Sequence, residues 1–162
     1  MSDLQRVRVW AEALIALHLD EGWSFGFDNA KRRAGLCDYT KRRISLSRYL
    51  SARYDDDTNH QTLLHEVAHA LAGSAAGHGP AWKRVARELG YVGGATHHGE
   101  TATDLAPWVG VCPNGHVVYR HRKATRPTSC ASCAARYDPR FAFTWTRREI
   151  TRAARMAAST PR

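Results

Sequence analysis

Residues 65–69 read His-Glu-Val-Ala-His, two histidines four positions apart with a glutamate after the first. On a helix, 100° per residue places His65 and His69 on one side, one turn apart. Two imidazoles placed in this way can share one zinc ion, at roughly 2.0–2.1 Å from each nitrogen. Glu66 then lies beside the ion, where it can take a proton from a zinc-bound water as a general base. The pattern predicts metal-assisted hydrolysis.

A catalytic zinc needs a third protein ligand and an open position for water. The favoured candidate is His78, because the glycines at 77 and 79 allow a close backbone approach and Pro80 suits the first turn of a new helix. His97 and His98, in a glycine-rich loop over 91–107, are the alternatives. The remaining interpretation is an ordinary helix with two unrelated histidines. The apolar residues around the motif and the prompt stop at Gly73 argue against it.

A second group of metal-binding residue types lies near the C-terminus. Cys112 and His116 form one short pair, and Cys130 and Cys133 form another. Three cysteines and one histidine are an accepted structural zinc set. His121 is a possible substitute for His116. A redox function for the Cys-x-x-Cys pair is disfavoured, because the segment lacks the βαβ context of redox proteins.

The positive charge of the chain is unevenly distributed. The net charge is +9, yet residues 1–107 hold 13 Lys or Arg against 13 Asp or Glu, whereas residues 108–162 hold 11 against 2. A compact basic segment indicates a polyanion partner, with nucleic acid the first candidate and a solvated basic tail the alternative. Cations interleaved with an aromatic residue predict contacts to single-stranded or distorted DNA through Tyr119, Arg120, Arg122, Lys123 and Arg126.

The elements that would position these residues follow from apolar periodicity and from breakers. They indicate an α+β fold with two domains, at 1–107 and at 108–162, the second ending in a basic helix or tail. We expect helices over 3–20, 58–71, 80–89 and 147–158, and strands over 23–28, 44–47, 117–119 and 141–145. The strands at 23–28 and 44–47 are expected to pair, across a basic turn that contains Gly35.

The two histidine motifs together carry a family resemblance. The run His65-Glu66-x-x-His69, followed by Gly77-His78-Gly79-Pro80-Ala81-Trp82, resembles the SprT-like metalloproteases, the family that includes the Spartan protease domain. The strand, basic turn and strand ahead of the helix also resemble this family, so that the likeness spans about residues 5–95. Such proteins often carry a C-terminal zinc ribbon, whose first ligand pair is commonly two cysteines. The histidine in this pair leaves the fourth ribbon ligand open.

The resemblance implies a zincin-like helical metalloprotease domain with a small β-sheet, followed by a small β zinc ribbon. It implies an endopeptidase with two zinc ions, acting on proteins bound or crosslinked to DNA. His65, His69 and His78 would hold the catalytic ion, Glu66 would be the base, and a role in DNA–protein crosslink repair would follow. The stabiliser of the developing oxyanion stays open, with Tyr91 as one candidate.

Two other interpretations are open. One is a catalytically inactive zinc-ribbon module that binds DNA or regulates, although an intact Glu66 argues against it. The other is a metalloprotease with no nucleic-acid role, which the neutral first 107 residues permit. The chain has no apolar run of the roughly 18 residues that a membrane span needs, and charges interrupt its N-terminal apolar residues. We therefore expect a cytoplasmic protein that can associate with DNA and has no membrane partner.

Overall fold

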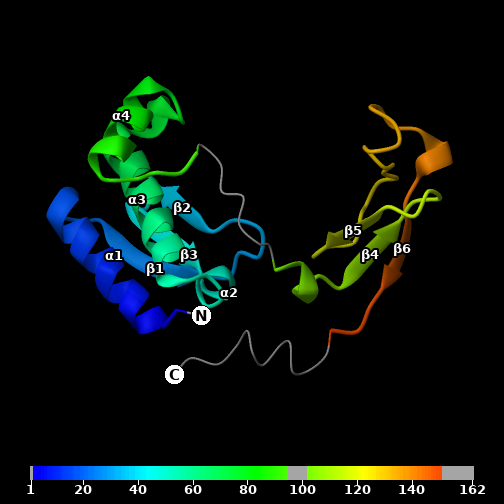
Figure 1. The fold of residues 1–162 in the computed structure, drawn as a ribbon, viewed down its shortest axis with the longest axis horizontal. Helices are drawn as coiled ribbons and strands as arrows, with labels where there is room; N and C mark the ends of the chain where they lie inside the picture. The colour runs from blue at the N-terminus through cyan, green and yellow to red at the C-terminus, as the bar shows by residue number, and fades with distance from the viewer. Residues whose placement is uncertain (1, 95–101, 151–162) are drawn as a thin grey trace. The chain divides into compact units, whose positions relative to one another are not determined.

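The computed structural model describes residues 2–94 and 102–150 (Figure 1). The chain forms two compact units that divide between residues 101 and 102. Both contain short strands, and the first also contains the α-helices, so the protein is of the α+β class. None of the described helices is long and apolar enough to cross a membrane.

The first unit contains four α-helices, one 3₁₀ helix and one sheet among its described residues. In chain order the elements are α1 (Leu4–His18), β1 (Ser24–Asp28), β2 (Gly35–Asp38), β3 (Arg43–Ser47), α2 (Arg48–Ser51), α3 (Asp56–Ala72), η1 (Ser74–Ala76) and α4 (Pro80–Glu88). Capping fixes α3, the helix that carries the histidine motif. The Asp55 side chain accepts the Thr58 N–H at 2.7 Å, and Gly73 ends the helix at a positive φ of 84°.

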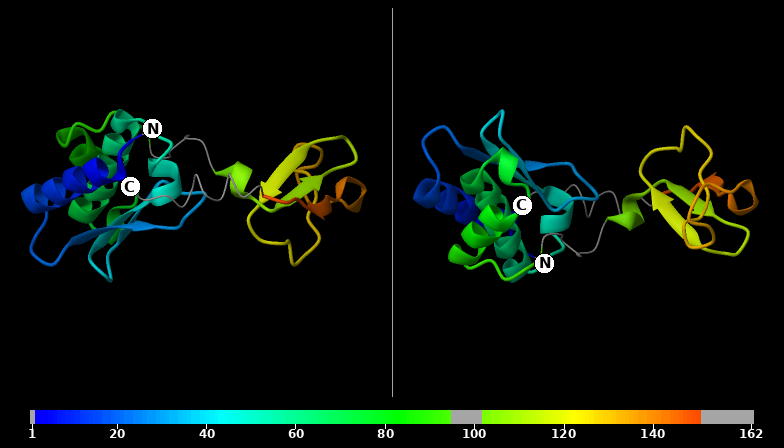
Figure 2. Two further views of the ribbon diagram at one scale, coloured as in Figure 1. Left: turned by 90° about the horizontal axis from the view of Figure 1, so that it is seen from below. Right: turned by 90° about the horizontal axis from the view of Figure 1, so that it is seen from above.

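The sheet has the order β1-β3-β2, with β1 parallel and β2 antiparallel to the central β3. The predicted pairing of 23–28 with 44–47 is therefore confirmed. Helices α1 and α3 pack on one side of this sheet (Figure 2). Between them lie the apolar residues of both layers, which include Val7, Ala11, Phe25, Leu46 and Leu63.

The expected turn around Gly35 is wrong in part, because β2 begins at that residue. Its four residues include glycine and aspartate, which have low strand propensity, so the local sequence gives no strand signal. The strand forms because its backbone hydrogen-bonds to β3, not because of its local sequence. In this register Gly35 lies opposite Leu46, and Cys37 lies opposite Ile44.

The second unit is a three-stranded antiparallel sheet with the order β5-β4-β6. Its elements are η2 (Thr103–Leu105), β4 (Trp108–Val111), β5 (Val117–Arg120), η3 (Pro139–Phe141) and β6 (Thr144–Arg147). The division at 101/102 precedes the predicted 107/108 because Arg148 ties the intervening segment to this unit. Its side chain donates to the Ala106 carbonyl at 2.7 Å, and its backbone N–H donates to the Pro107 carbonyl at 2.9 Å.

The predicted helix from Arg147 is wrong at its start. Arg147 is the last residue of β6, paired with Trp108, and residues 148–150 are not helical. The cross-strand hydrogen bonds of β6 take the place of helical ones there. The rest of the predicted segment, 151–162, lies outside the described residues.

Candidate metal centres

The side chains of His65, His69 and His78 converge on one point. The Nε2 atoms of His65 and His69 lie 3.2 Å apart, those of His69 and His78 3.0 Å, and those of His78 and His65 3.1 Å. His65 is buried, His69 is half-buried and His78 is exposed, so the group opens to solvent on the His78 side. The structure thus brings together the two histidines of the helix and the favoured third candidate. The alternatives His97 and His98 lie outside the described residues.

The donor set of this group suits a cation. A neutral imidazole offers one N–H and one lone pair, so three Nε2 atoms in mutual contact cannot all form donor–acceptor pairs. Two nitrogens at about 2.0–2.1 Å from a tetrahedral ion lie roughly 3.3 Å apart, which is close to the separations found here. Three histidines with one open side could hold a metal and leave a position for water or substrate.

Local backbone geometry brings His78 back to α3. Gly77 adopts a φ of 47°, which glycine adopts without strain, and the Gly79 N–H donates to the Ala76 carbonyl at 2.8 Å. A Cβ at Gly79 would stand 2.9 Å from that same oxygen, so the turn requires glycine. Helix α4 then begins at Pro80, in agreement with the sequence prediction of a helix starting at this residue.

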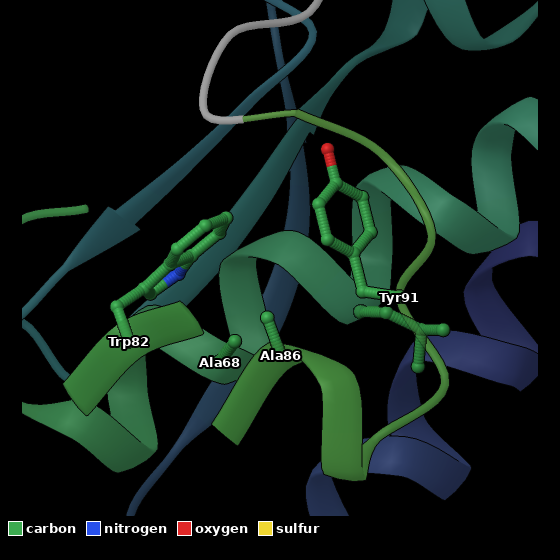
Figure 3. Packing of buried hydrophobic residues seen from close by; sticks show 5 residues of the cluster. Ala68, Trp82, Ala86 and Tyr91 are labelled. Carbon is green, nitrogen blue, oxygen red and sulfur yellow. The ribbon is translucent and has the colours of Figure 1, made fainter. Parts of the chain in front are cut away.

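Two aromatic side chains, Trp82 and Tyr91, pack against the histidine rings. The Trp82 ring of α4 lies 4.7 Å from the His78 ring and 4.8 Å from the His65 ring, and the Tyr91 ring lies 5.3 Å from that of His65. Figure 3 shows Trp82 and Tyr91 on either side of the small residues Ala68 and Ala86. Close packing of this kind restricts the rotamers of the three imidazoles.

Burial keeps His69 uncharged. Desolvation, together with the neighbouring His78, lowers the pKa of His69 to about 4. A neutral imidazole is the form that binds a metal. The His69 carbonyl accepts two hydrogen bonds, from the Tyr39 hydroxyl at 3.1 Å and from the Gly73 N–H at 3.0 Å. Tyr39 therefore fixes the turn of α3 on which His69 lies.

Glu66 is the next residue along α3 and is only 6% exposed. The backbone N–H of Cys37 in β2 lies close enough to the Glu66 carboxylate to favour the charged form. The Ser47 N–H donates to the Ala34 carbonyl, and bonded residues alternate along an antiparallel pair, so the Cys37 N–H points away from β3. Because β2 is an edge strand, its free edge faces Glu66.

The Glu66 side chain is largely shielded from solvent. Burial raises its pKa to about 8, while the Arg33 guanidinium and the Cys37 N–H act in the opposite direction. Desolvation also raises the pKa values of the Cys37 thiol and the Tyr39 hydroxyl to about 12, and Glu66 adds to both shifts. Sequence reasoning missed Cys37 and Tyr39, because neither belongs to a recognisable motif and only the strand pairing brings them to α3.

A sequence model of the SprT-like family matches residues 8–103, more than half of the chain. The chain belongs to the SprT-like family. Searches of the curated proteins and of the solved structures gave no match. Family membership indicates a metalloprotease type of function for this unit. The match ends before the four cysteine and histidine residues of the second unit.

The second unit of this SprT-like protein holds the other candidate metal centre, made by Cys112, His116, Cys130 and Cys133. The His116 Nδ1 atom lies 3.3–3.5 Å from the three Sγ atoms, and the Sγ atoms of Cys112 and Cys133 lie 3.9 Å apart. Each ligand pair comes from a tight turn, one closed by the Gly115 N–H on the Cys112 carbonyl at 2.8 Å. His121 is not part of this group. Three thiols and one imidazole could hold a structural metal.

The residues predicted to contact nucleic acid do not share one face of the β5-β4-β6 sheet. Arg120 and Tyr119 are neighbours on β5, so they point to opposite sides of the sheet. Arg120 pairs with Trp108, and its guanidinium lies 5.0 Å from the Trp145 ring centroid; Lys123 lies over Trp108 at 5.5 Å. Tyr119, 44% exposed, instead lies under Arg148 at 4.7 Å on the other side. Arg122 and Arg126 are exposed in the loop after β5.

Proposed function

We propose that this SprT-like protein is a zinc-dependent endopeptidase that acts on proteins held on, or crosslinked to, DNA. The observation that carries the proposal is the convergence of three histidine Nε2 atoms within 3.2 Å of one another, with Glu66 following the first ligand on α3. Membership of the SprT-like family supports the reaction class.

His65, His69 and His78 would hold the catalytic zinc, and bound zinc would polarise a peptide carbonyl and acidify a water molecule. Glu66 would act as the general base, taking a proton from the attacking water and returning it to the leaving amine. The Cys37 N–H orients the Glu66 carboxylate, and Tyr39 positions His69 through its carbonyl. The Tyr91 hydroxyl, an early candidate for oxyanion stabilisation, donates to the Gly94 carbonyl at 2.8 Å, so we assign it no catalytic step.

The ribbon would hold a second, structural zinc through Cys112, His116, Cys130 and Cys133. We propose that it binds single-stranded or distorted DNA. The face with Trp108, Trp145, Arg120 and Lys123 supports this, since indole rings stack on bases and cations contact phosphates. Arg122 and Arg126 in the adjoining loop would add phosphate contacts, whereas Tyr119 would contact DNA only from the opposite side.

Elemental analysis tests the metal assignment. We expect two zinc ions per chain, with the His65→Ala and Cys130→Ala variants each losing one. A single zinc that is lost only with Cys130→Ala, together with refusal of added zinc at the histidines, would overturn the catalytic site. It would leave the alternative, an inactive zinc-ribbon module that binds DNA or regulates.

A further inference from the structure

The first unit concentrates its positive charge around its sheet, although residues 1–107 are neutral overall. Residues 28–48 hold seven Lys or Arg and two Asp, whereas the rest of 1–107 holds six Lys or Arg and eleven Asp or Glu. Six of these seven cations belong to the strands and connections of the β1-β3-β2 sheet, and the seventh, Arg48, begins α2. A charge separation of this kind gives one surface a strong positive potential.

Strand alternation defines an outer face of the sheet, turned away from the helices. Phe25, Ile44 and Leu46 point toward α1 and α3. The alternate residues point the other way, so the outer face consists of Ser24, Gly26, Asp28, Leu36, Asp38, Arg43, Ser45 and Ser47, of which Gly26, Ser45 and Ser47 are buried beneath neighbouring groups. The helices lie on the opposite side in both views of Figure 2. Leu36, 39% exposed, is the one large apolar side chain of this face.

Cations border the outer face at both ends. One group, Lys31 to Arg33, lies in the connection from β1 to β2, and the other, Lys41 to Arg43, lies at the turn from β2 to β3. Strands of four or five residues at about 3.3 Å per residue hold the two groups roughly 15 Å apart. Arg33 and Lys41 bridge to the aspartates of the face, Asp28 at 2.8 Å and Asp38 at 3.9 Å.

Arg32, Arg42 and Arg43 are exposed and have no carboxylate partner within the part of the chain that the structure describes. Arg42 has a φ of 46°, a conformation that glycine or asparagine adopts at lower cost. The Arg43 guanidinium lies over Gly26, where the Cβ of any other residue would collide with it. Arg43 therefore lies across the sheet face itself, whereas the Arg42 guanidinium, at a backbone position that disfavours arginine, donates to the Glu21 carbonyl at 3.5 Å.

We infer that the outer face of the β1-β3-β2 sheet binds the phosphate backbone of double-helical DNA. Two cation groups at a fixed separation suit a rigid partner with a regular charge, and duplex DNA carries one charge per about 1.7 Å of its axis. The face has no aromatic side chain on which an unpaired base could stack. It has only one large apolar side chain, Leu36, which is fewer than the set with which a peripheral protein inserts into a lipid surface. The inference is independent of the peptidase activity.

The test is fluorescence anisotropy of the full-length protein with a labelled duplex of about 20 base pairs, over a range of salt concentrations. The sheet variant carries Arg32→Ala, Arg42→Gly and Arg43→Ala. Its matched control removes the same charge from exposed positions of α4, through Lys83→Ala, Arg84→Ala and Arg87→Ala. We expect the sheet variant to lose about tenfold in affinity and its salt slope to fall by about 2.7, because each phosphate contact contributes about 0.9.

The α4 variant is expected to bind within about twofold of the wild-type protein, since screening removes most of the effect of distant charges. Equal losses in the two variants, or no loss in the sheet variant, would overturn the inference. Circular dichroism and zinc content establish that both variants are folded.

Two further arms separate the outer face from other anion-binding explanations. In a background of Arg120→Ala, Arg122→Ala and Lys123→Ala, the sheet substitutions are expected to weaken duplex binding by the same factor. If they have no effect in that background, the duplex binds to the second unit and the inference fails. Binding to vesicles that contain phosphatidylserine is expected to be the same for the wild-type and sheet variants. A parallel loss on vesicles would show that the face recognises anionic surfaces in general, which contradicts the assignment.

Discussion

Gly35 in β2 lies against Glu66 in α3 with no room for a side chain between them. A Cβ at position 35 would stand 2.5 Å from Oε1, 2.7 Å from Cγ and 2.9 Å from Cδ of Glu66. The Cys37 N–H, two residues further along the strand, stabilises the charged form of the same carboxylate. The edge strand therefore fixes where the proposed base can stand.

Gly35→Ala is expected to displace the Glu66 carboxylate without touching a metal ligand. General-base catalysis contributes about 10²–10⁴-fold, so we expect kcat to fall by about 10²-fold while zinc content stays at the wild-type value. Steady-state kinetics and elemental analysis on the same sample measure both. Gly94→Ala is the matched control, because nothing lies within 4 Å of a Cβ at that position. Wild-type kcat in Gly35→Ala would show that the position of Glu66 does not matter.

Tyr39 donates a hydrogen bond to the backbone carbonyl of His69, so removal of its hydroxyl tests how far the fold orients that ligand. Tyr39→Phe deletes the hydrogen bond to the His69 carbonyl and leaves the ring in place. Outer-shell partners of metal ligands typically contribute 10–100-fold in metal affinity, and we expect zinc to bind about tenfold more weakly. Competition with a chromogenic chelator measures this. Tyr49→Phe, at a half-buried ring under Lys31, serves as the control. Equal affinities in the two variants would refute a positioning role.

The N-cap residue of α3, Asp55, should make the stability of the protein decrease at low pH. Hydrogen bonds from the side chain and the backbone of Thr58 lower the pKa of Asp55 below its ordinary 3.8. A depressed pKa in the folded state stabilises the protein above the unfolded pKa, and this contribution is lost as pH falls through the folded one. Asn caps helices about as well as Asp but cannot ionise. Wild-type protein should therefore melt above Asp55→Asn at neutral pH, and the difference should vanish once the pH has fallen through the lowered pKa of the folded state. A constant difference in Tm across this range would contradict the assignment.

The geometry of the metal-binding group in the second unit predicts which histidine is its fourth ligand. The His116 Nδ1 atom lies within 3.5 Å of all three sulfurs, and His121 is outside the group. His116→Ala should lose one zinc per chain, and His121→Ala should keep it. Elemental analysis of the two variants decides between them, and the opposite pattern would reverse the assignment.

Local sequence signals predict part of this fold and part of the site. Capping residues, prolines and glycines mark α1, α3 and α4, and the spacing of His65, His69 and His78 indicates that they act together. By contrast, β2 depends on pairing with β3, and no local pattern marks the residues that β2 brings to Glu66. Strand alternation likewise separates Tyr119 from Arg120, although they are adjacent in a sequence that reads as one basic and aromatic run.

The distribution of charge on the surface is likewise only partly predictable from the sequence. Residues 1–107 have no net charge, so the sequence gives no sign that positive charges cluster. The clustering becomes visible only in the fold, where cations lie at both ends of one face of the sheet. Counting charges by segment predicts the basic ribbon, because its excess is continuous along the chain. It does not predict the outer face, which forms only when the hairpin brings two separate basic runs to one surface.

The proposed peptidase activity is tested most directly by cleavage of a basic DNA-binding protein presented on single-stranded DNA, comparing the wild type with Glu66→Gln at equal zinc content. The amide keeps the size of the Glu66 side chain but cannot accept a proton from water. We expect the wild type to cleave the bound protein and the variant to be slower by at least about 10²-fold. Equal rates, or no cleavage by fully zinc-loaded wild-type protein, would contradict the assignment of this site to peptide hydrolysis.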